Sequence, residues 1–158
     1  MKILLIVLSA AVLFSGCVGT PAASTTAVAS TDFSEIPGNE WKLTEVRING
    51  RSTDFNRSAL TQSGFGESFT LNVSAELING VGAPNRYTAP YTVGEDNSIN
   101  IGRVASTLMA ALLEPPNLRE HDYFTYIQNS YKWDIRNNNL ELFSKAENGN
   151  EIILIFSL

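Results

Sequence analysis

Apolar residues alternate with polar ones through most of the chain after residue 40. Successive side chains of a β-strand point to opposite faces, so this alternation predicts half-buried strands. Near Glu45 the alternation slips by one residue, which indicates an irregularity within the first strand. The alternating segments are residues 41–48, 69–73, 87–93, 99–101, 131–135, 140–142 and 152–156.

Residues that favour turns separate these segments. Asn49-Gly50 has the composition of a type I′ hairpin turn. Asn, Asp and Gly also gather at residues 79–80, 94–97, 137–139 and 148–149. Seven or more short strands joined mostly by hairpins predict a mainly β (α+β) fold, a small antiparallel β-barrel or sandwich.

A helical crossover is expected over about residues 106–129, where the alternation is interrupted. Apolar residues at helical spacing predict a first helix that ends at Pro115-Pro116: Leu108, Met109, Leu112 and Leu113. Asn117 as N-cap and Glu120 three residues later form a capping box for a second helix. This helix is expected to pack on one end of the barrel as part of the core, through Tyr123, Phe124, Tyr126 and Ile127.

The N-terminus reads as a secretory signal peptide over residues 1–16. Lys2 precedes an apolar run, Ile3 to Phe14, and the small residues Ser15-Gly16 follow it. This run of 12 residues is shorter than the ~20 that a transmembrane helix needs. Residues 13–17 resemble a bacterial lipobox, which implies lipidation of Cys17; the alternative is an ordinary signal peptide that contains a cysteine.

Lipidation would decide where the protein works and which chemistry is left to it. Several acyl chains on Cys17 would hold it stably on a membrane, and Val18, by resemblance to Gram-negative lipoproteins, implies the outer membrane. Cys17 is the only cysteine, so the mature chain would keep no thiol for a disulfide, a nucleophile or a metal site. Removal of Lys2 leaves ten basic residues against 16 acidic ones, a poor composition for binding nucleic acid.

The chain divides into three parts on composition. After the signal peptide, residues 17–37 contain the lipidated cysteine and a segment rich in Ala, Ser and Thr, which we interpret as a flexible tether. Residues 38–158 carry the alternating pattern and form the domain.

Residues 41–156 are similar to the META domain family of HslJ-like envelope and heat-shock-associated proteins. The residues that carry the resemblance are Trp41-Lys42-Leu43, the segment 80–87 with Tyr91, Ile99-Asn100-Ile101, Thr107-Leu108-Met109-Ala110, Leu140-Glu141-Leu142 and Ile155-Phe156. The resemblance implies a compact antiparallel β fold with a helical crossover. It implies no enzymatic activity, and it associates the protein with the cell envelope and stress tolerance.

The family pattern has cysteines at two positions that are Pro84 and Ala111 here. Because a single remaining thiol would be exposed to oxidation in an oxidising compartment, the loss of both is coherent if the two positions are neighbours. We therefore expect Pro84 and Ala111 to lie side by side.

The polar candidates for function are few. His121, the only histidine, has Glu120 and Asp122 beside it, but adjacent helical residues point away from one another. No metal-ligand spacing and no cofactor motif accompanies it. Asn85, Arg86 and Tyr87 form a candidate partner-binding patch, because Tyr and Arg often carry interface energy; the alternative is a turn with a solvated Arg86 and a packed Tyr87.

Two classes of function follow. The first is a non-catalytic envelope lipoprotein that binds a protein or envelope component through its domain. A variant of it is an inhibitor of an envelope hydrolase, for which Arg51 to Glu67 would be the protruding loop. The second is an envelope hydrolase, which would need His121 in a deep pocket with a carboxylate and a hydroxyl in reach.

Overall fold

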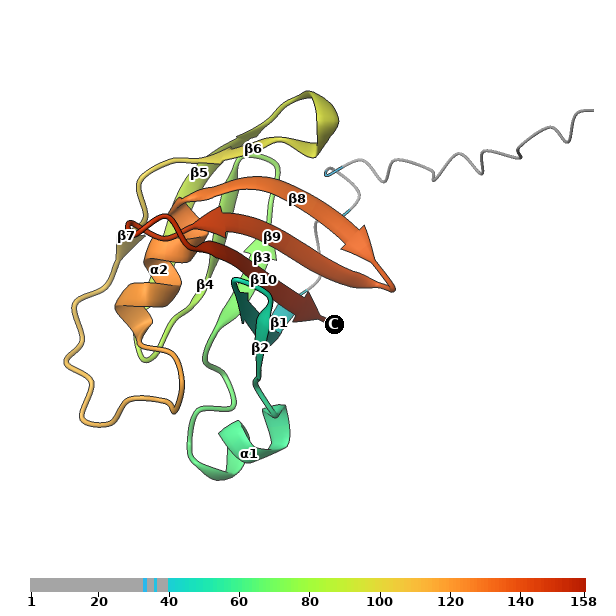
Figure 1. Cartoon of the computed structure of the whole chain (residues 1–158). Coiled ribbons are helices and arrows are strands. Elements are labelled where there is room, and N and C mark those ends of the chain that lie inside the picture. Colours follow the sequence, from blue (N-terminus) through green and yellow to red (C-terminus); the bar gives the residue numbers. More distant parts are fainter. Residues whose placement is uncertain (1–32, 34–35, 37–39) are drawn as a thin grey trace, which may run out of the picture. The chain divides into compact units, whose positions relative to one another are not determined.

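The computed structural model describes Phe33, Ile36 and residues 40–158 of the chain. The predicted signal peptide, Cys17 and most of the predicted tether lie outside the described residues. The described part consists of ten strands and three short helices (Figure 1). The strands are β1 Glu40–Ile48, β2 Arg51–Asp54, β3 Thr70–Val73, β4 Leu77–Val81, β5 Arg86–Val93, β6 Ile99–Ile101, β7 Ala105–Ser106, β8 Ser130–Arg136, β9 Asn139–Lys145 and β10 Glu151–Ser157. The helices are α1 Arg57–Gln62, the 3₁₀ helix η2 Glu95–Asn97 and α2 Glu120–Gln128.

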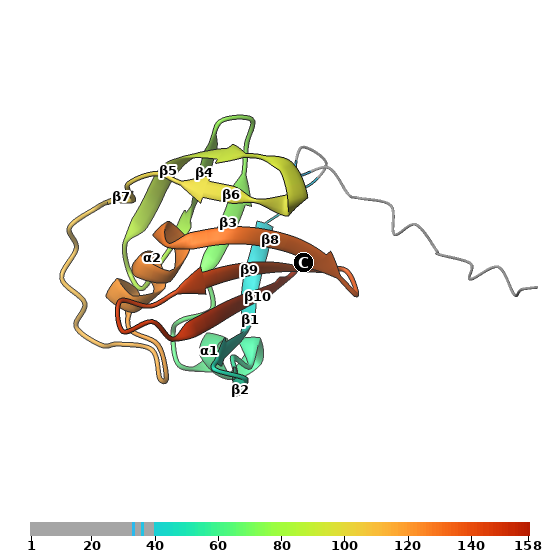
Figure 2. The same cartoon turned by 45° about the horizontal axis from the view of Figure 1, so that its top comes forward.

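All paired strands are antiparallel, and they form one strongly curved sheet. The order is β6-β5-β4-β3-β1-β10-β9-β8, with β2 paired to β1 and β7 paired to β5. A bridge between Ser98 and Lys132 connects the two ends of this order. The sheet thus curls into a nearly closed barrel with α2 at one end (Figure 2). This confirms the predicted mainly β fold with hairpin connections.

Strand β1 follows its sequence pattern closely. Its pairing with β10 shifts between Leu43 and Glu45, where the apolar alternation slips. Asn49 and Gly50 both have positive φ, 49° and 80°, as a type I′ turn requires, and they connect β1 to β2. Both sequence predictions for this strand are therefore confirmed.

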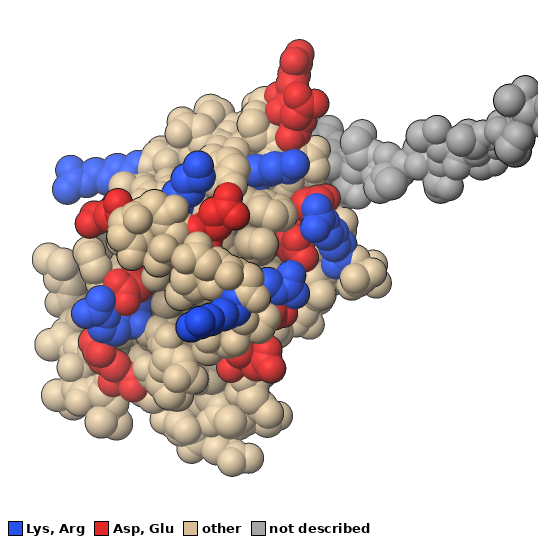
Figure 3. Space-filling view, viewed as in Figure 1, with Lys and Arg blue, Asp and Glu red and all other residues tan. Residues whose placement is uncertain are grey.

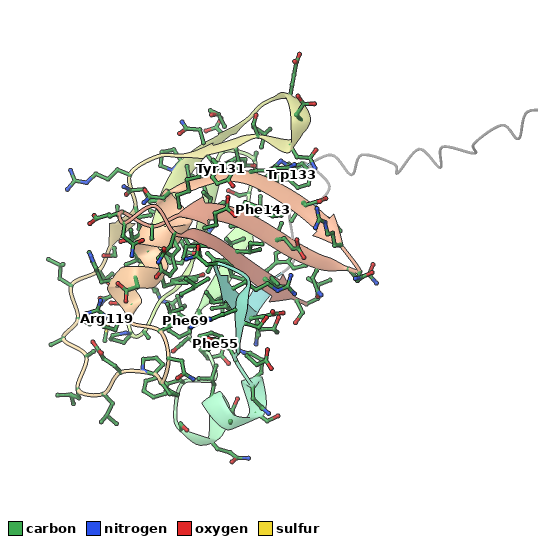
Figure 4. The ribbon with its side chains drawn as sticks, in the orientation of Figure 1. Phe55, Phe69, Arg119, Tyr131, Trp133 and Phe143 are labelled. Atoms are coloured by element: carbon green, nitrogen blue, oxygen red, sulfur yellow. The ribbon has the colours of Figure 1, made fainter. Side chains whose placement is uncertain are left out.

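The barrel interior is filled by the apolar residues that the alternation predicts. Leu43, Leu140 and Leu154 are fully buried. Phe69 packs edge to face against Phe55, with ring centroids 5.9 Å apart (Figure 4). The stripe of α2 also lies inward, as expected for a core helix, because Tyr123 and Ile127 are fully buried.

Two residues from the segment assigned to the tether also belong to this core. Phe33 and Ile36 are buried, with 2% and 3% of their surface exposed. The ring of Phe33 lies edge-on to Trp133, with centroids 4.9 Å apart, and to Tyr91, at 5.1 Å. The apolar core therefore includes residues that precede position 38.

The turn predicted at Asn79-Gly80 is wrong, because both residues lie inside strand β4. Gly80 pairs with Tyr87 of β5. A Cβ atom at position 80 would lie 2.0 Å from the carbonyl oxygen of Thr70. This glycine therefore permits close approach of two backbones and makes no turn.

The first helix of the predicted crossover is also wrong. After β7, the chain from Thr107 to Asn117 is a wide loop beside α2 (Figure 1). A short helix gains most of its stability by packing an apolar face, and the apolar residues of this loop are exposed. The crossover keeps one helix, α2.

The predicted capping box is wrong as well. The N-cap of α2 is Arg119, and Asn117 has a left-handed backbone with φ of 71°. The carboxylate of Glu120 instead accepts hydrogen bonds from the backbone of residues 83 and 85.

No helix among the described residues has the length and apolar character needed to cross a membrane.

Candidate functional site

The connection between β4 and β5 is held by a carboxylate from α2. Glu120 Oε1 accepts hydrogen bonds from the backbone N–H groups of Ala83 and Asn85, the latter at 2.6 Å. A Cβ atom at Gly82 would lie 2.7 Å from the same oxygen, so the helix can approach only a glycine there. The start of α2 therefore fixes the conformation of residues 82–85.

Asn85 joins this connection to the loop after β7. Its Oδ1 accepts from Met109 N at 2.7 Å and from the Thr107 hydroxyl at 2.8 Å. Its Nδ2 donates to Glu120 Oε2 at 2.7 Å and to Met109 O at 3.1 Å. All four hydrogen-bonding positions of the amide are thus used, and the residue is 6% exposed. We call Asn85 and Glu120 the clamp.

Beyond the clamp the loop exposes a group of large apolar side chains. Leu108 is 98% exposed, Leu112 96%, Leu113 74% and Met109 61%. No charged residue occurs between Arg103 and Glu114. Scattered single apolar residues are normal on a protein surface, but four in one short loop indicate an interaction site. We call residues 107–114 the apolar loop.

Sequence reasoning missed this site because the helical spacing of these side chains predicted a helix, and no surface role was assigned to them. The role of Glu120 gave no sequence signal, since its partners are 35 to 37 residues away.

The three residues of the predicted patch do not present one surface. Asn85 is buried in the clamp, and Tyr87 is 3% exposed. Arg86 is exposed at the base of the apolar loop, where its carbonyl oxygen accepts from Thr107 N at 3.0 Å. Only Arg86 of the three is therefore accessible to a partner.

Tyr87 instead forms a buried pair with Tyr123. Their hydroxyl oxygens are 3.2 Å apart, and both hydroxyls donate to the carbonyl oxygen of Thr70, at 3.0 and 2.9 Å. Burial raises the pKa of both hydroxyls well above the usual value. These tyrosines are therefore neutral and structural under physiological conditions.

His121 lies exposed on α2 in an open depression of about 360 Å³ that is also lined by Asp122, Thr125 and Glu147. Asp122 is paired with Arg119, at 2.9 and 3.0 Å (Arg119 is labelled in Figure 4). The Thr125 hydroxyl donates to the carbonyl oxygen of His121, not to its imidazole. Two groups that could assist His121, the Asp122 carboxylate and the Thr125 hydroxyl, are thus engaged with other groups.

The segment predicted to protrude, Arg51 to Glu67, is folded against the barrel. It contains β2 and α1, whose N-cap Asn56 accepts from Ala59 N at 3.0 Å. The guanidinium of Arg57 donates to three backbone carbonyls, those of Leu43, Gly66 and Ser68. An inhibitory loop has a better candidate in residues 107–114.

Charges of both signs are mixed on the face drawn in Figure 3. On the outer surface of β8 and β9, Arg136 pairs with Asp134 at 2.8 Å and lies 3.7 Å from Glu141. Lys132 and Arg136 lie 6.0 and 5.8 Å from the ring centroid of Phe143. In the part of the chain that the structure describes, no three His, Cys, Asp or Glu residues are placed to hold a metal ion.

Comparisons with known proteins agree with the fold. The META domain family matches residues 34–155. No curated protein matches the sequence. An NMR structure of a protein from Burkholderia xenovorans is similar at 19% identity and a TM-score of 0.52, covering 87% of this chain and 97% of that one. A crystal structure of a DUF4847 family protein from Bacteroides vulgatus is similar at 15% identity and a TM-score of 0.50, covering 77% and 93%.

These two structures share the fold, at identities too low to carry a function. The family match carries more weight, because it extends over most of the sequence and includes all ten strands, the last of them up to Ile155. It also contains every residue on which the resemblance was based except Phe156. The chain belongs to the META domain family.

Proposed function

We propose that this protein is a non-catalytic lipoprotein of the bacterial envelope whose barrel presents the apolar loop to a binding partner. The exposed leucines of residues 107–114 carry the proposal. Burying a leucine side chain is favourable by ~1.5–3 kcal/mol, so leaving three exposed is costly unless they are covered in use. The partner is an envelope protein or component, and a role under stress is in keeping with the family.

The clamp supports a binding role for the loop. A flexible loop loses conformational entropy when a partner orders it, which weakens association. Here Asn85 already fixes both backbone groups of Met109 from the barrel side. The leucines are therefore presented from a base that is organised before binding.

The lipid anchor is the second part of the proposal and rests on the sequence. The lipobox at residues 13–17 places Cys17 where diacylglycerol would be attached, and Val18 favours the outer membrane. Replacing Cys17 by Ser is expected to abolish labelling with radioactive palmitate and cleavage before residue 17. Labelling that persists in this variant would refute the anchor.

Binding by the apolar loop is tested by photocrosslinking in cells. A photoreactive amino acid at position 112 is compared with the same residue at Leu77, which is 43% exposed on β4. We expect abundant adducts, with protein or with lipid, from position 112 and few from position 77. Equal, weak crosslinking at both positions would contradict a binding role for the loop.

An inhibitor of an envelope hydrolase remains the second candidate. The observation that favours it is the same loop, because a protruding segment on a fixed base can enter an active-site cleft. Its adducts from position 112 would be with one hydrolase. A hydrolase centred on His121 has less support, since its neighbours Asp122 and Thr125 are bonded elsewhere.

A further inference from the structure

The apolar loop has the composition of a helix and the structure of a coil. Seven of its eight residues are Ala, Leu, Met or Glu, which are among the strongest helix formers. An isolated helix of this length is unstable in water, because nucleation is costly and the apolar face has nothing to pack on. The sequence therefore specifies a helix that lacks its packing surface.

A helix over residues 108–114 would be amphipathic. With about 100° between successive residues, Leu108, Leu112, Met109 and Leu113 would fall within an arc of about 140°. Thr107, Ala110, Ala111 and Glu114 would occupy the opposite side. Such a face fits a flat or grooved apolar surface.

The clamp is compatible with this helix. The first N–H groups of a helix have no partner within it, and Met109 N, already bonded to Asn85 Oδ1, would be one of them. Met109 O accepts from Asn85 Nδ2 and keeps a lone pair for a helical hydrogen bond. Asn85 would then act as an N-cap supplied from another strand.

The surroundings of the loop favour a lipid surface as the occupant. Ten consecutive residues, 104–113, carry no charge that would have to be desolvated in a bilayer. Arg86 is exposed at the base of the loop, and Arg103 is exposed just before β7; both could bind anionic headgroups. Only 15 residues separate Cys17 from Phe33, which is packed in the barrel core, so a lipidated chain would hold the barrel within about 55 Å of the bilayer.

We infer that residues 107–114 fold into a short amphipathic helix on the bilayer surface and form a second membrane contact. The inference rests on the proposed function and names the partner of that loop as lipid. Tethering makes the contact intramolecular, so a weak intrinsic affinity is enough to populate it. The barrel would then be held in one orientation on the membrane.

The test uses the chain from residue 17 onward with Cys17→Ser, so that no acyl chain binds. Its partitioning to vesicles of phosphatidylcholine with phosphatidylglycerol is measured by cosedimentation. Leu112→Ser with Leu113→Ser should weaken partitioning about a hundredfold, from the lost burial of two leucines. The matched control, Leu77→Ser with Val93→Ser, removes two other exposed apolar residues and should change partitioning less than about twofold.

Two further variants separate the helix and the charges. Ala110→Gly with Ala111→Gly should weaken partitioning roughly twentyfold, because each glycine disfavours a helix about four- to fivefold and leaves a coil unaffected. Arg86→Gln with Arg103→Gln should weaken binding to anionic vesicles, by roughly fivefold per arginine, and not to pure phosphatidylcholine. In bicelles, helical carbon chemical shifts are expected over residues 108–113.

The outcomes distinguish this inference from the proposed function. Vesicle binding that depends on Leu112 and Leu113 and falls with the two glycines supports it. An unchanged affinity of the glycine variant overturns the helix. If the chain does not bind vesicles while position 112 crosslinks to a protein in cells, the lipid inference is overturned and the binding function stands. If neither lipid nor protein is found, both are refuted.

Discussion

Replacing Asn85 by alanine should destabilise the protein and release the apolar loop together. Its amide makes four hydrogen bonds while it is 6% exposed, so the variant leaves several groups without a partner. The largest loss of stability is expected at Glu120 Oε2, a carboxylate oxygen that loses its hydrogen-bond donor at 2.7 Å. The Ala83 and Asn85 N–H groups on the other oxygen stay in place.

The magnitude follows from these contacts. A hydrogen bond to a charged group contributes about 1.5–3 kcal/mol. The bonds to Thr107 and Met109 contribute less, because the loop is exposed and water can replace the lost partner. We therefore expect the free energy of unfolding to fall by about 2–4 kcal/mol.

Urea denaturation measures the change in stability, and hydrogen exchange of the Met109 amide reports the loop. The Met109 amide should exchange much faster in Asn85→Ala than in the wild type. The control is Asn79→Ala, which removes an exposed asparagine from β4 and should change stability by less than about 0.5 kcal/mol. If Asn85→Ala unfolds at the wild-type urea concentration with Met109 still protected, the clamp does not hold the loop.

Three further predictions concern the barrel and its connection to the apolar loop. Gly80→Ala should lower the free energy of unfolding by about 3 kcal/mol or more, because the new Cβ would lie 2.0 Å from a backbone carbonyl oxygen. Urea denaturation measures this change, and a midpoint equal to that of the wild type would contradict it. Stability should fall as pH rises above about 10, since burial raises the pKa of Tyr87 and Tyr123 and only the unfolded chain then loses these protons; Tyr123→Phe should flatten the fall. Pro84→Cys with Ala111→Cys should form a disulfide on export, stabilising by roughly 3–4 kcal/mol less strain; two free thiols by mass spectrometry would refute their proximity.

The strands could be predicted from the sequence because their pattern is local. A strand with one face in the core alternates every second residue, and the bulge of β1 leaves its own trace between Leu43 and Glu45. Asn49-Gly50 likewise specifies its turn through backbone geometry alone. Asn79-Gly80 has the same letters and lies in a strand, since close packing on Thr70 also requires a glycine.

The site could not be predicted in the same way because its contacts join residues that are far apart in the sequence. Glu120 three residues after Asn117 has the spacing of a capping box. In the fold its carboxylate instead binds the β4–β5 connection, 35 to 37 residues away. The carboxylate of Glu120 could cap its own helix or bind the distant β4–β5 connection, and that connection supplies three hydrogen-bond donors.

The two wrong predictions after β7, the first helix and the capping box, therefore have one physical origin, and this origin bears on function. Asn85 is buried and Glu120 half-buried, whereas the four large apolar residues of the loop are exposed. This inverts the usual distribution of polar and apolar side chains. The hydrogen bonds of the clamp stabilise the base of the loop, but its exposed leucines forgo the stability that burial would contribute, unless a partner covers them. Residues 107–114 have a helix-forming sequence, a fixed base and, up to Leu113, no charge. A binding surface would supply the packing that a helix of this length lacks in water, and would let the loop adopt the helix that its sequence favours.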